Sequence, residues 1–180
     1  MTYRKYLGPS EIPVILGCPY STPAELREKL ENPTVFKSTP KIRMGMKLEK
    51  DMLQKYSSTI NSKSKLNIKF KSHDRLGGRA DGIYDDGQVI RGVEIKCQFV
   101  TSDDNNDDPV IYDSYVQQSV AYMFLYQLEH WDVFCVRVNT DTKKSKILLK
   151  RLKWKDYEQT WRTNWYPKIK AFTDNVNWKK

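Results

Sequence analysis

Apolar residues recur at helical spacing in three stretches of the chain. Residues 40–57 place Ile42, Met46, Met52, Leu53 and Tyr56 on roughly one face, which predicts a long helix. Residues 112–129 are apolar with the same period, and residues 154–172 predict a closing helix. Pro167 lies inside that last stretch, so we expect the closing helix to bend or split there.

Capping residues predict two shorter helices near the N-terminus. In residues 9–17, Ser10 is the expected N-cap and Gly17 the expected end. In residues 21–32, Thr22 is the expected N-cap, Pro23 the first helical residue, and Glu25, three residues past the cap, would complete a capping box.

The remaining apolar pattern predicts strands. Residues 62–70 change from a polar linker into an alternating strand, and residues 130–139 and 144–152 are two further strands. Residues 75–98 predict a hairpin that turns at "DDGQ", because Asp-Gly between β-rich segments favours a tight turn. The order of elements predicts one α/β domain over residues 1–180, with helices packed against a central mixed sheet.

Composition narrows the class of protein. Hydrophobic residues form 39% of the 180, and no apolar run reaches the roughly 20 residues of a membrane span. The N-terminus lacks the features of a signal peptide, so we expect an intracellular protein, cytoplasmic or, in a eukaryotic host, nuclear. A net charge of +9 favours a polyanionic partner such as nucleic acid. The three cysteines and two histidines have no zinc-site spacing.

Two other features have competing interpretations. The loop "SDDNNDDP", residues 102–109, lacks the central glycine and terminal glutamate of a calcium-binding EF-hand, so we expect a solvated loop, which could also cover a site. Trp154, Trp161 and Trp165 lie among basic residues, as in base-stacking surfaces. Their helical spacing favours core packing instead.

One constellation of polar residues lies in the predicted hairpin. Asp81 is expected at the end of one strand, and Glu94 and Lys96 lie on one face of its partner, because residues i and i+2 of a strand share a face. Two carboxylates and the backbone carbonyl of Ile95 could hold Mg²⁺, and Lys96 could orient or deprotonate an attacking water. The alternative is a surface ion pair between Glu94 and Lys96.

Polar residues on two predicted helices support the first interpretation. Glu49 interrupts the apolar face of residues 40–57. Gln118 and Tyr122 form an i, i+4 pair on the apolar helix of residues 112–128, where they could brace Lys96 and a metal ion.

Five blocks of sequence, taken together, resemble the lambda-exonuclease and YqaJ branch of the PD-(D/E)XK nuclease superfamily. The blocks are "GPSEIPVILGCPYSTPAELREKLEN", "RMGMKLEKDML", "RADGIYDDG", "VEIKC" and "YVQQSVAYM", in the family's order over roughly residues 8 to 135. The resemblance implies a restriction-endonuclease-like α/β core, a central mixed sheet flanked by helices. It also implies a magnesium-dependent DNA exonuclease that acts 5′ to 3′ on duplex ends, in viral or phage recombination or replication.

The resemblance also implies roles for single residues. Asp81 would bridge two Mg²⁺ ions, with Mn²⁺ as an alternative, while Glu94 and the Ile95 carbonyl would hold the catalytic ion. Lys96 would position the nucleophilic water, Gln118 would steady Lys96 or the water, and Glu49 would support the metal site. The predicted DNA contacts are Ser10, Arg43, Tyr122, Arg4 and Lys5.

The chain departs from the family pattern at three places. Ala80 replaces the proline before the aspartate, Gln98 replaces the proline after "KC", and the N-terminal Trp and Arg cluster is reduced to "MTYRKYLG". Arg4 or Lys5 would then have to grip the 5′ phosphate. The resemblance further implies duplex DNA ends as substrate, a ring-shaped homotrimer and a single-strand annealing protein as partner. A monomer or dimer, a structure-specific or nicking endonuclease, and a non-catalytic DNA-binding module remain alternatives.

Overall fold

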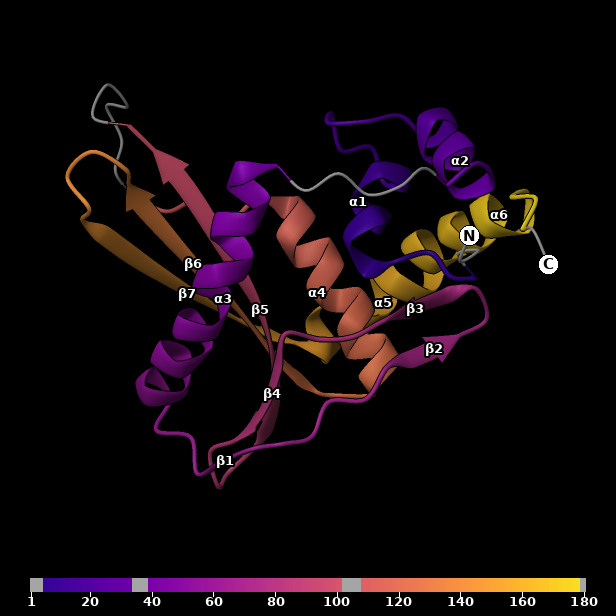
Figure 1. The fold of residues 1–180 in the computed structure, drawn as a ribbon. Helices are drawn as coiled ribbons and strands as arrows, with labels where there is room; N and C mark the ends of the chain where they lie inside the picture. Colours follow the sequence, from indigo (N-terminus) through magenta and orange to yellow (C-terminus); the bar gives the residue numbers. More distant parts are fainter. Residues whose placement is uncertain (1–4, 34–38, 102–107, 179–180) are drawn as a thin grey trace.

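The computed structural model describes residues 5–33, 39–101 and 108–178. A five-stranded sheet with the order β1-β4-β5-β6-β7 forms its centre, and β2 and β3 form a separate two-stranded sheet (Figure 1). The strands are β1 (Ser64–Lys65), β2 (Lys71–His73), β3 (Leu76–Gly78), β4 (Gly82–Asp85), β5 (Ile90–Val100), β6 (His130–Asn139) and β7 (Ser145–Lys153). The α-helices are α1 (Ile12–Ile15), α2 (Pro23–Glu31), α3 (Pro40–Thr59), α4 (Asp113–Tyr126), α5 (Glu158–Thr160) and α6 (Tyr166–Asp174).

The central sheet is mixed, as the sequence predicts. β5 pairs with β4 and β6 with β7 in antiparallel fashion, whereas β5 and β6 are parallel. A parallel pair needs a long crossover, and α4 provides it. This crossover lays α4 directly against β5 and β6, the strands that form the middle of the sheet.

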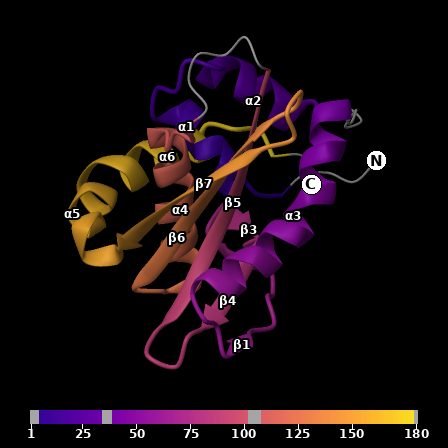
Figure 2. The ribbon, with the colours of Figure 1, turned by 90° about the vertical axis from the view of Figure 1, so that its left-hand side faces the viewer.

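Helices cover both faces of the sheet (Figure 2). One apolar cluster joins α4 to the N-terminal helices, the C-terminal helices and one face of the sheet, with Trp131 and Trp161 fully buried. A second cluster joins α3 to the opposite face through Leu53, Tyr56 and Phe134. Successive β5 residues therefore point alternately towards α4 and towards α3.

Gly92 allows the close packing on the α4 face. A Cβ atom at this position would collide with the ring of Trp131, so only glycine fits there. The Trp131 ring in turn stacks on Tyr122 of α4, with ring centroids 5.4 Å apart and nearly parallel planes. The contact fixes how closely α4 lies over β5.

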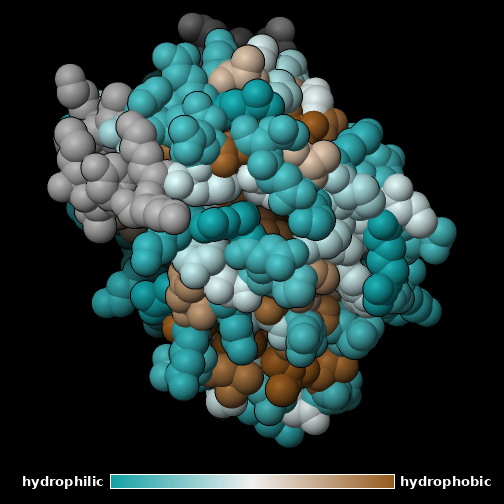
Figure 3. Space-filling model, turned by 90° about the vertical axis from the view of Figure 1, so that its right-hand side faces the viewer, coloured by the Kyte–Doolittle hydropathy of each residue, from teal (hydrophilic) through white to brown (hydrophobic). Residues whose placement is uncertain are grey.

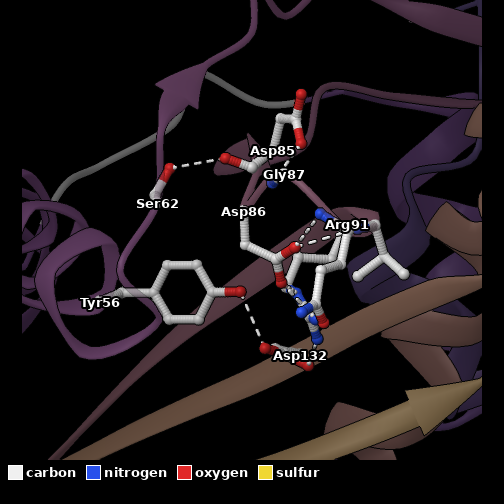
Figure 4. Close-up of polar contacts among 9 residues, drawn as sticks. Tyr56, Ser62, Asp85, Asp86, Gly87, Arg91 and Asp132 are labelled. Carbon is white, nitrogen blue, oxygen red and sulfur yellow. Dashed lines mark hydrogen bonds and ion pairs between the residues drawn. The ribbon is translucent and has the colours of Figure 1, made fainter.

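A buried polar network ties α3 to the sheet on the other face (Figure 4). The Tyr56 hydroxyl donates a hydrogen bond of 2.8 Å to Asp132 Oδ2 of β6, and both residues are fully buried. Arg91 of β5 lies 3.6 Å from Asp132 Oδ1 and donates two hydrogen bonds to Asp86 in the turn between β4 and β5. Residues from α3 and β5 thus meet around one buried carboxylate of β6, and the β4–β5 turn holds the arginine.

Several predicted elements are confirmed. Thr22 caps α2 by accepting a hydrogen bond from Glu25 N–H, while the Glu25 carboxylate accepts one from Thr22 N–H. Gly17 follows α1 with a φ of +97°, a conformation that glycine adopts readily. The closing helix splits into α5, a π-helical turn Trp161–Trp165 and α6, and Pro167 lies in the first turn of α6.

Other predictions about local structure are wrong. Ser10 is not an N-cap: Gly8 precedes the 3-10 turn Pro9–Glu11, and its N–H donates to the Glu11 carboxylate. The predicted strand of residues 62–70 contributes only the two residues of β1. The predicted hairpin of residues 75–98 is confirmed for β4 and β5, but its first residues form β3, which pairs with β2 instead.

The three tryptophans of the C-terminal segment pack in the core rather than offering a stacking surface. Trp161 is fully buried, and Trp154 and Trp165 are partly buried against the larger apolar cluster. All three cysteines are free thiols. No helix within the described ranges is both long and apolar enough to cross a membrane.

Candidate active site

The β4–β5 hairpin brings Asp81 next to Glu94. Gly82, the first residue of β4, pairs with Val93 of β5. Asp81 therefore stands just before β4, at its start and not at its end as predicted. Its carboxylate Oδ2 accepts a hydrogen bond of 2.8 Å from the Ile95 N–H, which holds it against the middle of β5.

Glu94, Lys96 and Gln118 form a closed triangle of polar contacts. Lys96 Nζ lies 2.8 Å from Glu94 Oε1 and donates to Gln118 Oε1, also at 2.8 Å. Gln118 Nε2 donates to the same Glu94 oxygen at 2.7 Å. The Gln118 amide from α4 thus contacts both charged residues of β5, and its role in steadying Lys96 stays a prediction.

This ion pair is largely buried, unlike a surface pair, and the Lys96 side chain is 22% exposed. Glu94 is only 3% exposed. Burial raises the pKa of the Glu94 carboxyl, although the charge of Lys96 opposes that rise. Burial alone would lower the pKa of Lys96, but the Glu94 carboxylate outweighs it and raises the pKa, so Lys96 stays protonated.

Asp81 shares this electrostatic environment. Burial, followed by the charges of Glu94 and Glu49, raises the pKa of Asp81 to about 8, against the opposing effect of the Ile95 N–H. Carboxylates that raise one another's pKa values lack enough positive charge nearby. Lys96 is the cation among the causes of this shift, and it is already paired with Glu94.

Glu49 approaches the site from α3. It is half-buried and lines two cavities. One cavity, about 500 Å³, also reaches Asp81 and Ala80, and the other, about 420 Å³, reaches Ile95 and Cys97. Glu49 and Asp81 thus share one cavity, and the charges of Glu49 and Glu94 both act on Asp81.

The residues present fit a hard divalent cation. Glu94 Oε2 is buried without a hydrogen-bond partner, so one carboxylate oxygen of the site is left for a ligand. No group of three or more His, Cys, Asp or Glu side chains closes on one point within the described ranges. Mg²⁺ does not require one, since it is commonly held by one or two carboxylates and keeps several waters.

The residues predicted to contact DNA do not lie together in one site, unlike the predicted catalytic residues. Ser10 and Lys5 are exposed near the N-terminus, Arg43 is exposed on α3, and Arg4 lies outside the described residues. Tyr122 is buried at 7% exposure, and its hydroxyl donates to the Arg79 carbonyl. The Tyr122 side chain is thus engaged inside the protein, which does not favour the predicted contact with DNA.

Sequence reasoning missed two tyrosines and one contact of Gln98. The Tyr126 hydroxyl accepts from Ala80 N–H and donates to the Lys69 carbonyl, so it fixes the segment before Asp81. The ring of Tyr115 lies 5.2 Å from Lys96 Nζ. Tyr126 follows Tyr122 by four residues, and Tyr115 precedes Gln118 by three. This helical spacing is the signal that could have found them.

Gln98, which replaces the family's proline, has a structural role. Its amide donates to the Val110 carbonyl and accepts from the Val110 N–H, at 2.7 Å and 3.1 Å. It therefore holds the segment that leads into α4 against β5. Residues 102–107, which include Asp103, Asp104 and Asp107 of the aspartate-rich loop, lie outside the described residues.

The family model of the YqaJ-like viral recombinase domain matches residues 2–128. The chain belongs to this family. The match spans α1 to α4 and so includes Glu49, Asp81, Glu94, Lys96 and Gln118. No curated protein matches the chain significantly in sequence.

Solved structures share the fold at low sequence identity. An alkaline exonuclease from Laribacter hongkongensis, crystallised with dAMP, is 14% identical with a TM-score of 0.71 over 97% of this chain and 89% of that one. A phage-related exonuclease from Haemophilus somnus 129PT is 15% identical, with a TM-score of 0.64 over 96% of this chain and 95% of that one. The α/β fold is thus that of exonucleases of the PD-(D/E)XK type.

Proposed function

We propose that the protein is a magnesium-dependent deoxyribonuclease, and that it degrades duplex DNA from its ends in the 5′ to 3′ direction. The observation that carries the proposal is the buried Glu94–Lys96–Gln118 triangle beside Asp81. A buried acid and base are costly unless they serve each other or a site. Here one oxygen of Glu94 is left without a partner, and a second carboxylate stands beside it.

Asp81, Glu94 and the Ile95 carbonyl would hold the metal ion, with Glu49 supporting them from α3. Mg²⁺, or Mn²⁺ in its place, would neutralise charge on the scissile phosphate and lower the pKa of a bound water. Two ions fit the number of carboxylates. The backbone bond from Ile95 N–H fixes the Asp81 carboxylate, so this ligand would need little reorganisation.

Lys96 is better suited to positioning than to removing a proton. An ammonium group has three N–H donors, and Glu94 and Gln118 take two of them. The third is left for the attacking water or a phosphate oxygen. Because the neighbouring carboxylate raises the pKa of Lys96, the side chain stays charged and acts as a donor at neutral pH.

DNA as the substrate is supported by charge and by the relatives. The chain carries a net charge of +9, which favours a polyanion. The Laribacter exonuclease of the same fold was crystallised with dAMP, a deoxynucleoside monophosphate. Family membership further supports a homotrimeric ring and a single-strand annealing protein as partner, as parts of the same proposal.

A comparison of linear and covalently closed circular duplex DNA tests the proposal. With Mg²⁺, we expect linear DNA to be degraded to mononucleotides and closed circles to survive; without it, we expect neither to be cut. Opening of the closed circle would favour a nicking or structure-specific endonuclease on the same core. Binding without cleavage of either substrate would favour a DNA-binding module.

A further inference from the structure

One of the two cavities at Glu49 has an unusual distribution of charge. Its acidic part is Glu49 and Asp81, which belong to the candidate active site. Its other charged residues are Lys65 of β1 and Arg79, which precedes Asp81 by two residues. An acidic half and a basic half thus share one space of about 500 Å³.

The two cations are not used to neutralise the acids. Among the described residues, neither Lys65 nor Arg79 forms an ion pair with a carboxylate, and both side chains are exposed. Lys65 Nζ instead lies 5.8 Å from the centre of the Tyr84 ring. Both positive charges therefore remain available to an anion that enters the cavity.

The backbone beneath each cation is firmly held. The Arg79 carbonyl accepts from the Tyr122 hydroxyl, and the next N–H, of Ala80, donates to the Tyr126 hydroxyl, so α4 fixes this segment. Lys65 pairs with Tyr84 of β4, and the following Leu66 N–H donates to the Ile83 carbonyl. The two cations therefore stand at opposite ends of β4, on supports that do not depend on a ligand.

We propose that Lys65 and Arg79 form a phosphate clamp for the DNA strand that enters the active site. The clamp would hold phosphodiesters next to the scissile one, on the β4 side of Asp81. The apolar part of the cavity, Leu53, Leu66 and Ile68, would face the deoxyribose rings. The inference rests on the proposed function for its substrate, but its contacts are electrostatic and do not need the metal ion.

The test measures DNA affinity against salt concentration in EDTA, so that no cleavage takes place. Each phosphate contact contributes about 0.9 to the slope of log affinity against log salt for duplex DNA, so Lys65→Ala/Arg79→Ala should reduce that slope by about 1.8. The conservative pair Lys65→Arg/Arg79→Lys keeps both charges and should keep the slope. Thermal unfolding midpoints establish that each variant is folded.

A matched control removes the same charge elsewhere. Lys29 of α2 and Lys168 of α6 are exposed, and these helices lie at the end of the molecule away from β1 (Figure 1). That end presents a mostly hydrophilic surface (Figure 3). Lys29→Ala/Lys168→Ala loses two charges and should leave the slope at the wild-type value.

A slope for Lys65→Ala/Arg79→Ala equal to that of the control pair would overturn the clamp. That result is distinguishable from failure of the proposed function. If the wild-type protein binds DNA with the clamp-dependent slope but cuts nothing with Mg²⁺, the nuclease is refuted and the clamp is retained. If it cuts normally and the slope does not depend on Lys65 and Arg79, only the clamp is refuted.

Discussion

At the scale of single residues, the arrangement around Lys96 separates positioning from simple charge pairing. Gln118 contacts both members of the pair, accepting from Lys96 and donating to Glu94. Neither a surface ion pair nor a core polar cluster requires this third group. The amide therefore fixes the direction in which the remaining N–H of Lys96 points.

Replacement of Lys96 tests this arrangement. Lys96→Met keeps the length and apolar stem of the side chain, so we expect the fold and metal binding to persist. Cleavage should slow by roughly 10²-fold or more, the usual scale for the loss of a positioned acid–base group. Gln118→Ala should slow it less, because Gln118 acts through Lys96. Single-turnover cleavage of linear duplex DNA measures the rates of both variants. A wild-type rate in Lys96→Met would mean that the Glu94–Lys96 pair is only structural.

The raised pKa of Asp81 predicts how stability depends on pH. The folded protein keeps the Asp81 proton up to about pH 8, whereas the unfolded chain releases it near pH 4. Between these values the folded state binds more protons, so its stability should fall as pH rises. In EDTA, the thermal midpoint should decline from pH 5 to pH 8.5, and less steeply in Asp81→Asn. Equal slopes in the two proteins would contradict the assignment.

At the scale of elements, a buried long-range hydrogen bond anchors α3. The Tyr56 hydroxyl bonds to Asp132, which lies in β6 and is fully buried (Figure 4). Burial raises the pKa of Asp132, and the bond from Tyr56 opposes that rise. This contact anchors the C-terminal half of α3, two helical turns beyond Glu49.

Removal of the Tyr56 hydroxyl should weaken this anchor. Tyr56→Phe leaves the Asp132 carboxylate short of a donor, at a cost of about 1–3 kcal/mol in the free energy of unfolding. The matched control is Tyr84→Phe, whose hydroxyl donates only to the Leu53 carbonyl, at 3.3 Å. We expect a smaller loss for the control, about 0.5–1.5 kcal/mol. Urea unfolding compares the two, and a larger loss for Tyr84→Phe would contradict the role given to Asp132.

The elements that sequence reasoning predicts well have a local signal. Helical period and capping residues are sufficient for α2, α3 and α4, and Asp-Gly for the turn of the β4–β5 hairpin. β2 is three exposed residues, so it carries no burial pattern to detect. Glycine at the N-cap replaced the expected Ser10, since the Glu11 side chain supplies the capping contact from inside the turn.

In the candidate active site, too, the residues with a local sequence signal were predicted and those without one were not. The i+2 spacing of Glu94 and Lys96 was sufficient to predict their shared face, and family motifs to predict Gln118. The burial of Tyr122 depends on its stacking with Trp131 across the β5–β6 crossover, which no local pattern contains. Lys65 and Arg79 were not predicted either, because their shared cavity exists only once β1 pairs with β4.

At the scale of the whole molecule, the mixed sheet explains why the site lies where it does. Glu94 and Lys96 lie on β5, the middle strand of the sheet, with α4 on one face and α3 on the other. Asp81 enters at the start of β4, on the neighbouring strand. Glu94 is thus buried beneath the helices, while the cavities at Glu49 leave Glu49 and Asp81 open to substrate.

The central claim is that Asp81 and Glu94 form the active site of a metal-dependent nuclease. The most direct measurement compares Mg²⁺-dependent degradation of linear duplex DNA by the wild-type protein, Asp81→Ala and Glu94→Ala, with DNA binding measured beside it. Because each substitution removes a ligand but leaves the basic surface, we expect both variants to lose cleavage and still bind DNA. Near-normal cleavage by either variant would contradict the account.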